Sequence, residues 1–403
     1  MKSRWIFGCA RAAVAAACAA LCLNVCALAS TNSPARAAND GFNDGIDRND
    51  PDFVKASLLI FGPGEELFSC VGHVALRMEC PAFDLDYCFS YEGERIAERL
   101  PKYFAGQLKM GLFAIPTEEI VSLCGAGGRS LTQYTLNLPP GVKQELWKIL
   151  DDKAAEGVDL PYDYLARGCG KATWECLVAA LKNNGVDYAY AGGNPYAALT
   201  PRERFGEELC VSHPWNLFIL NAIVGTEVDV VEPVVLPRDV LYWAQNTKIA
   251  GQTIAAEAGE ALVPAAAVSP PNGISPLHVV CLFLGLSILS FFVGSDVLNC
   301  FFLAVQSLLG LFMTYLVIAF WLPNSNWNWL IVPFNLLPLV FWRWRRHWAL
   351  PFAGVLVLWE LFMLLSPHRL TDPAYLVFVL AYVILYMKIA IKDGPVFLSF
   401  LKK

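Results

Sequence analysis

The chain has 403 residues, of which 56% are hydrophobic and 16% are charged, with a formal net charge of −6. It is too apolar for an ordinary soluble enzyme, and its composition excludes a disordered or collagen-like chain. The charge is uneven, because residues 1–30 carry +3, residues 276–403 carry +4 and the stretch between them carries −13. An acidic middle region argues against nucleic-acid binding through phosphate neutralisation.

Residues 1–29 are predicted to be a secretory signal peptide. Lys2 precedes a long apolar run, and Ala27-Leu28-Ala29 fits the small-x-small pattern of a cleavage site. Two alternatives stay open: the segment is an uncleaved membrane anchor, or the chain is a lipoprotein modified at Cys26. A small residue is missing just before that cysteine, which weakens the lipoprotein alternative. Under each interpretation, residues 31–275 are exported.

The exported part divides into a domain and a linker. Residues 50–245 are long enough for one compact domain and mix strand-like with helix-like patterns. Residues 246–275 are rich in Ala, Gly and Pro and are predicted to be a linker to the membrane. The predicted strands cover 55–61, 74–78, 87–91 and 131–138, and the predicted helices cover 142–156 and 168–181.

Residues 276–403 are predicted to form a transmembrane domain of about five helices. About 20 apolar residues cross the hydrocarbon layer as a helix, and most of the five apolar runs approach or exceed that length. The third run is short and contains two prolines, so we expect a kinked or re-entrant segment there. The runs cover 277–294, 297–322, 329–342, 349–366 and 373–391.

Basic residues give the expected orientation in the membrane. One basic cluster, at residues 342–346, separates runs three and four, and lysines surround and follow the end of run five. The positive-inside rule places both groups in the cytoplasm. Five crossings then put residues 31–275 in the periplasm and the C-terminus in the cytoplasm, as expected for a multi-pass protein of the cell inner membrane.

Cysteine and histidine usage narrows the chemistry of the exported part. It has seven cysteines, an odd number that leaves at least one thiol unpaired unless it bonds another chain. Cys169 follows Gly168 and opens a predicted helix, whose N-terminus lowers the pKa of a thiol and offers N–H groups to an oxyanion. His73 precedes a predicted strand and is the expected base. A disulfide from Cys169 to Cys176 or Cys210 is the alternative.

Other ligand signals are missing from the sequence. It has no His, Cys and carboxylate cluster with the spacing of a structural zinc site, so we expect no metal. It also has no P-loop, no G-x-G-x-x-G and no G-x-S-x-G motif, and we expect no cofactor. The chemistry is therefore expected to come from side chains of this chain.

Residues 58–77 contain Pro63-Gly64-Glu65-Glu66-Leu67-Phe68-Ser69-Cys70-Val71-Gly72-His73-Val74-Ala75-Leu76-Arg77. This segment resembles the Lnb N-terminal periplasmic domain family of bacterial exported proteins, formerly a domain of unknown function. The family pattern is P-G-x-E-L-x-S-x-x-G-H-x-A-apolar-R, followed later by Y-D-apolar-x-N-C. The second motif corresponds to residues 162–169, where Gly168 replaces the usual Asn. The resemblance covers about residues 52–245.

The resemblance implies an α+β fold of the permuted papain-like type, found in NlpC/P60 and lecithin:retinol acyltransferase-like proteins, in which the His precedes the Cys. With its membrane tail, the chain is similar to bacterial lipoprotein N-acyltransferases. An acyl chain of a phospholipid donor would then pass through a thioester on Cys169 to the amine of a lipoprotein acceptor. Residues 324–329 resemble the Asn-rich periplasmic loop of that family, so Asn326 and Asn328 are expected to contact substrate.

Further site residues follow from these expectations. Tyr91 or Glu92 is expected to orient His73, and Arg77 to contact a phosphate, unless it is a solvated strand residue. Glu360, an intramembrane carboxylate, is expected to receive the substrate ammonium, unless it only packs within the helices. Two other functions stay open: a periplasmic cysteine peptidase or amidase acting on cell-wall peptides, and a non-catalytic membrane-anchored binding domain.

Overall fold

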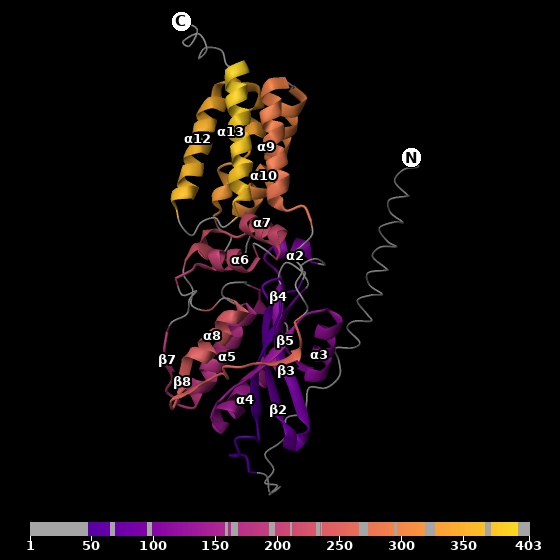
Figure 1. Ribbon diagram of the computed structural model, residues 1–403, viewed down its shortest axis with the longest axis vertical. Coiled ribbons are helices and arrows are strands. Elements are labelled where there is room, and N and C mark those ends of the chain that lie inside the picture. Colours follow the sequence, from indigo (N-terminus) through magenta and orange to yellow (C-terminus); the bar gives the residue numbers. More distant parts are fainter. Residues whose placement is uncertain are drawn as a thin grey trace, which may run out of the picture. The chain divides into compact units, whose positions relative to one another are not determined.

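The computed structural model describes residues 47–64, 69–94, 99–157, 160–162, 168–192, 198–209, 212–230, 234, 236–265, 273–293, 296–318, 327–366 and 372–393. These residues belong to one compact unit that begins at Asp47. The predicted signal peptide, residues 1–29, lies outside the described residues. The unit combines an antiparallel sheet and its covering helices with a bundle of long apolar helices (Figure 1). The expected α+β class and the membrane-type helices are therefore confirmed.

A seven-stranded sheet with the order β10-β5-β1-β2-β3-β4-β6 lies at the centre of the N-terminal part, and each neighbouring pair of strands is antiparallel. Side chains alternate between its faces, so Leu76 and Ala75 are both buried but in different apolar clusters. The strands are β1 Lys55–Phe61, β2 His73–Cys80, β3 Leu85–Gly93, β4 Lys109–Pro116, β5 Leu131–Thr135, β6 Leu160–Pro161 and β10 Glu260–Val263.

Helices cover both faces of this sheet (Figure 1). On one face, Leu58 and Leu76 pack with Leu146 of α4 (Pro140–Glu156) and with α5 (Cys169–Asn183) and α8 (Pro237–Asn246). On the other face, Leu59 and Ala75 pack with α3 (Thr117–Ala126). Each fully buried aliphatic side chain contributes about 1.5–3 kcal/mol to the free energy of folding, so the two clusters fix the sheet between its covering helices. A short helix, α2 (Leu100–Phe104), precedes β4.

The prediction of a linker is wrong for residues 247–263, because this range contains three short strands. β8 (Thr247–Ile249) and β9 (Gln252–Thr253) join β7 (Ala189–Tyr190) in a small sheet. β10 pairs with β5 and thereby covers one edge of the main sheet. An Ala- and Gly-rich composition hides such short edge strands, because their pairing partners lie far away in the sequence.

The C-terminal part contains four described helices that are long and apolar enough to cross a membrane. They are α9 (Pro276–Val293), α10 (Asp296–Ile318), α12 (Arg345–Leu365) and α13 (Ala374–Asp393). Among the described residues, these four helices match four of the five predicted apolar runs. The third apolar run forms only short pieces, namely η4 (Trp329–Ile331), α11 (Leu337–Val340) and η5 (Trp342–Trp344).

Residues 328–345 still connect opposite ends of the bundle. Asn328 contacts α7 (Pro214–Ile223), and Tyr375 at the start of α13 also contacts this helix. The start of α12 lies at the other end, because Trp348 packs against Tyr386 near the end of α13. The irregular segment therefore runs from one end of the bundle to the other, beside the four long helices.

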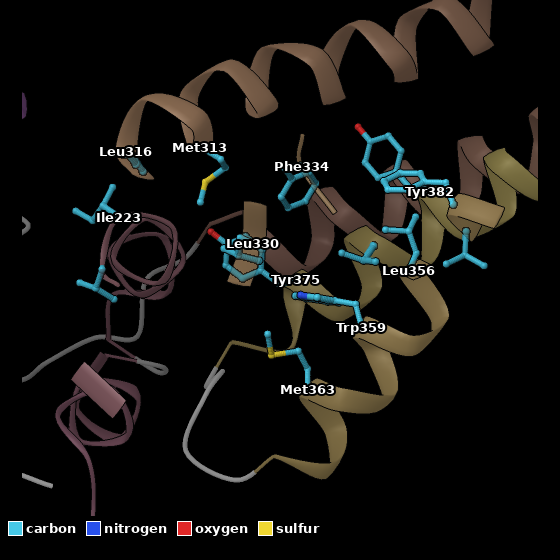
Figure 2. Packing of buried hydrophobic residues seen from close by; sticks show 14 of the residues in the cluster. Ile223, Met313, Leu316, Leu330, Phe334, Leu356, Trp359, Met363, Tyr375 and Tyr382 are labelled. Atoms are coloured by element: carbon cyan, nitrogen blue, oxygen red, sulfur yellow. The ribbon is translucent and has the colours of Figure 1, made fainter. Parts of the chain in front are cut away.

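Protein groups satisfy the backbone of this irregular pass. Gln306 of α10 donates a hydrogen bond to the Pro333 carbonyl at 2.7 Å and accepts one from the hydroxyl of Tyr386. A non-helical backbone at membrane depth is stable only where protein rather than lipid surrounds it. Figure 2 shows how the segment fills the bundle, with Phe334 directed towards Tyr382 and Leu330 beside Tyr375.

Candidate active site

Cys169 and His73 meet at one end of the main sheet. Cys169 is the first residue of α5, and His73 is the first residue of β2. Their side chains are hydrogen bonded to each other, and the backbone of Val74 also hydrogen-bonds the Cys169 sulfur. The cysteine thus lies at a helix N-terminus, where the helix dipole favours a thiolate, with an imidazole in contact.

The turn before β2 explains why a glycine precedes His73. Gly72 has a φ of +83°, a conformation that side chains rarely adopt. A Cβ added there would lie 2.7 Å from the carbonyl oxygen of Phe61. Phe61 is also the register partner of His73, and their rings meet edge to face with centroids 5.2 Å apart. Glycine therefore permits the close turn that fixes the imidazole on Phe61.

A serine and a glutamate hold the other side of the imidazole. His73 Nε2 lies 2.7 Å from Ser90 Oγ, and the Ser90 hydroxyl donates to Glu92 Oε1 at 2.7 Å. Glu92 Oε1 itself lies 3.6 Å from His73 Nε2, and its side chain is 50% exposed. Because Nε2 faces Ser90, the other ring nitrogen is left for the thiol. The series of contacts from Cys169 through His73 and Ser90 to Glu92 resembles the site of a cysteine enzyme. Cys169 has the position of the nucleophile, His73 that of the base, and Ser90 with Glu92 that of the orienting group.

The electrostatics of the pair favour a thiolate beside an imidazolium. Burial alone would raise the pKa of the Cys169 thiol, but the charge and hydrogen bond of His73 outweigh burial and lower it. Burial alone would lower the pKa of His73, but the charge and hydrogen bond of Cys169, with a smaller effect of Glu92, raise it to about 9. The two shifts act in the same sense, because both favour a proton on the imidazole rather than on the sulfur.

The other described cysteines of the sheet domain lack this activation. Burial raises the pKa of Cys70 to about 11, and it also raises the pKa values of Cys88 and Cys176. Cys88 and Cys176 are free thiols, as is Cys169. The alternative of a disulfide to Cys176 therefore does not hold in this structure, while Cys210 lies outside the described residues.

The structure separates the two candidates for the orienting residue. Tyr91 lies on the opposite face of β3 from Ser90 and Glu92, and its hydroxyl contacts the Cys176 sulfur at 3.5 Å. The prediction for Tyr91 is therefore wrong, and Glu92 acts through Ser90. Sequence reasoning missed Ser90, although strand alternation already places residues 90 and 92 on one face.

Arg77 is not available for a phosphate. Its Nε and Nη2 atoms donate to the carboxylate of Asp86 at 2.8 and 2.7 Å, and Nη1 donates to Gln133. Nη2 also lies 3.1 Å from Glu79. This bidentate pair raises the pKa of Arg77 and holds the pKa of Asp86 below its usual range. Arg77 of the motif thus links strand β2 to strands β3 and β5.

The remaining predicted substrate contacts lie in the membrane part. Asn328 is 6% exposed and donates to the carbonyls of Asn221, Ala222 and Val224 at the end of α7. This amide has a structural role, so its predicted substrate contact is wrong, whereas Asn326 lies outside the described residues. Glu360 of α12 has a buried Oε1 with no hydrogen-bond partner in the described part of the chain, and its role stays a prediction.

The end of the sheet that carries Cys169 and His73 packs towards the helix bundle. Val71, close to His73, contacts the apolar cluster that runs from α7 into the bundle, and it also contacts Leu217 of α7. The Phe218 ring of α7 stacks on Tyr375 of α13 with centroids 4.2 Å apart. α7 carries no charged residue. The pair Cys169–His73 is thereby fixed at the side of the domain that adjoins the bundle.

α7 also presents apolar side chains outwards. Trp215 and Ile219 are each 43% exposed and lie on one face of the helix, four residues apart. The Trp215 indole donates to the Ile274 carbonyl just before α9 at 2.7 Å. Tryptophan beside the end of a membrane helix is typical of the membrane–water interface.

The site has neither a recognisable set of metal ligands in the described residues nor a matching protein of known family. Within the described residues, no group of three or more His, Cys, Asp or Glu side chains is arranged to hold a metal ion. No protein-family model matches the chain, and neither a curated protein nor a solved structure matches it. The resemblance of residues 58–77 to the Lnb family therefore depends on the motif residues alone.

Proposed function

We propose that the protein is a membrane-bound, cysteine-dependent acyltransferase that moves an acyl chain from a phospholipid through a Cys169 thioester to the N-terminal amine of a lipoprotein. The single observation that carries the proposal is the hydrogen-bonded pair of Cys169 and His73, with the pKa of the thiol lowered and that of the imidazole raised. A buried cysteine with a purely structural role needs neither shift.

The first step acylates the enzyme. The Cys169 thiolate attacks an ester carbonyl of the phospholipid, and a C–S bond forms as the ester C–O bond breaks. The His73 imidazolium gives its proton to the leaving alkoxide, which departs as a lysophospholipid. The free N–H groups at the start of α5 stabilise the oxyanion of the tetrahedral intermediate.

The second step transfers the acyl chain. The acceptor amine attacks the thioester carbonyl, a C–N bond forms and the C–S bond breaks. His73 takes the proton that the amine loses, which restores the thiolate–imidazolium pair. Ser90 and Glu92 keep the ring oriented through both steps, since Nε2–H donates to Ser90 while the other nitrogen exchanges the proton.

The architecture supports a permuted papain-like arrangement in the periplasm of a cell with an inner membrane. A helix that begins with the cysteine packs on an antiparallel sheet whose strand begins with the histidine, and the histidine comes first in the chain. With the irregular segment as a fifth pass and the basic residues inside, the positive-inside rule supports a location of this domain outside the cytoplasm. Both substrates are anchored in the adjacent leaflet, and the pair lies at the end of the sheet nearest the bundle.

A cysteine peptidase or amidase is the second candidate, because the same pair can pass an acyl group to water. The exposed Trp215 and Ile219 of α7 and the four described membrane-length helices favour a lipid substrate over a soluble cell-wall peptide. The two candidates differ in the acceptor, which an experiment can supply.

The test uses full-length protein in phospholipid nanodiscs with a synthetic diacylated lipopeptide. We expect the lipopeptide to gain one acyl chain on its amine, and we expect Cys169→Ser to abolish this gain. Cys281→Ser, which removes an exposed thiol on α9, is the matched control and should retain it. Release of free fatty acid or cleavage of a cell-wall peptide, without N-acylation, would favour the second candidate.

A further inference from the structure

Arg129 lies at the same end of the sheet as the Cys169–His73 pair. It stands between α3 and β5, and its Nε and Nη2 atoms donate to the Gly62 carbonyl at 3.1 and 3.0 Å. Its guanidinium carbon is 5.7 Å from the centroid of the Phe61 ring, the same ring that meets His73 edge to face. One aromatic ring thus lies between the cation and the catalytic imidazole.

Arg129 differs from the other half-buried or buried arginines in its partners. Arg77, Arg202 and Arg204 each form an ion pair with a carboxylate at 2.6 or 2.7 Å. Among the residues that the structure describes, no carboxylate pairs with Arg129. A guanidinium has five N–H donors; the bonds to Gly62 use Nε and Nη2, and among the described residues no hydrogen bond from the Nη1 amino group is found. Withdrawing a cation from water without an anion is costly, so such a group is suited to an anionic ligand.

The position of the cation also affects the catalytic pair. The charge of Arg129 opposes protonation of His73, although Cys169 and Glu92 keep the pKa of His73 raised. An anion bound on Arg129 would remove this opposition. Gly64 lies against the guanidinium, because a Cβ added there would be 3.4 Å from Arg129 Nε.

We propose that Arg129 binds the phosphodiester of the glycerophospholipid whose acyl chain Cys169 receives. The proposal rests on the proposed acyltransferase function. In a glycerophospholipid the phosphate lies only a few bonds from the ester carbonyls, so a guanidinium that shares the Phe61 ring with His73 can hold the headgroup while the ester reaches the sulfur. Arginine binds phosphate through charge-assisted and often bidentate hydrogen bonds. Lys171 is a poorer candidate, because two residues along a helix from Cys169 it projects from another face.

The first experiment compares two acyl donors with the full-length protein. Loss of charge-assisted hydrogen bonds predicts that Arg129→Gln slows Cys169 acylation from phosphatidylglycerol by about 10- to 150-fold. Acylation by p-nitrophenyl hexanoate, which has no phosphate, should change less than about twofold, and Arg129→Lys should retain part of the phospholipid rate. Arg99→Gln, which removes an exposed cation paired with Glu94, is the charge-matched control. An equal loss with both donors, or no loss with either, overturns the proposal.

A second experiment measures binding without turnover. Diether phosphatidylglycerol has no ester to cleave, so it should slow the alkylation of Cys169 in the wild-type protein but not in Arg129→Gln. The matching diether glycerol without phosphate should not discriminate between the two proteins, and glycerol 3-phosphate should compete if the phosphate alone is recognised. Protection that does not depend on Arg129 contradicts the proposal. Arg129-dependent protection without any thioester would instead contradict acyl transfer and leave phospholipid binding supported.

Discussion

The Ser90 hydroxyl lies between His73 and Glu92, accepting from His73 Nε2 and donating to Glu92 Oε1, with both distances 2.7 Å. Ser90 is fully buried, whereas Glu92 is half exposed. The serine therefore transmits the charge of an outer carboxylate to the catalytic ring and fixes the ring orientation. Removing it should affect catalysis more than folding.

Ser90→Ala is expected to lower kcat/KM for acyl transfer. The lost hydrogen bond contributes about 1–3 kcal/mol, which corresponds to a decrease of about 5- to 150-fold. The measurement is steady-state acylation of a lipopeptide, together with the pH profile, whose alkaline limb should move to lower pH because Glu92 then supports the imidazolium less well. Ser57→Ala, at another buried serine of the sheet, is the matched control and should leave the pH profile unchanged.

The thiol of Cys169 should react in a pH window set by its partner. Its lowered pKa keeps the thiolate present below the usual value of about 8.5, and the pKa of His73 keeps the imidazolium present up to about 9. The ion pair is lost as pH falls through the cysteine pKa and as pH rises through the histidine pKa. In His73→Gln, burial is no longer opposed by the imidazolium, so alkylation of Cys169 at pH 7 should slow. Peptide mass spectrometry of iodoacetamide-treated protein measures this rate, and an unchanged rate would contradict the ion pair.

Gly72→Ala should displace His73 and destabilise the domain. A left-handed alanine costs about 1–2 kcal/mol, and the 2.7 Å approach of its Cβ to the Phe61 carbonyl adds strain. We expect a lower unfolding temperature together with slower alkylation of Cys169. Gly128 has a φ of +64°, but a Cβ added there would meet no atom within 4 Å. Gly128→Ala therefore measures the cost of the backbone conformation without the cost of a steric contact. Equal effects of the two substitutions would show that the contact with Phe61 is unimportant.

Asn328→Ala should weaken the attachment of α7 to the bundle. The amide nitrogen of Asn328 lies 2.9–3.2 Å from three carbonyl oxygens at the end of α7 and shares its two N–H donors among them, and buried carbonyls without partners cost about 1–3 kcal/mol. The unfolding temperature of the protein in detergent should therefore fall. Asn137→Ala, which removes one exposed hydrogen bond to the Thr253 carbonyl, should change it little. A larger effect at Asn137 than at Asn328 would contradict this structural role.

Strand alternation in the sequence contains more information on the site than the residue types do. Tyr91 and Glu92 are neighbours on one strand, so only one of them can face His73, and Ser90 shares the face of Glu92. Serine is frequent in strands, and nothing in its chemistry alone marks residue 90. The sequence does not reveal the position of Arg129 for a different reason. Arg129 lies beside Phe61 only because strand β5 pairs with strand β1.

Length and composition predicted the membrane helices better than the connections between them. The runs at α9, α10, α12 and α13 follow directly from apolar length. The path of residues 328–345 depends on Gln306 and Tyr386, which are distant in the sequence and satisfy its backbone. β10 was likewise concealed in an apparent linker, because an edge strand of four residues gains its stability from β5 rather than from its own sequence.

Mass spectrometry of the intact protein after incubation with phosphatidylglycerol tests the central proposal most directly. The account predicts an added mass of one acyl chain on Cys169, removed by neutral hydroxylamine as expected for a thioester and undetectable in Cys169→Ala. An unmodified Cys169 in protein whose alkylation shows a reactive thiolate, or an acyl chain attached elsewhere, would contradict it.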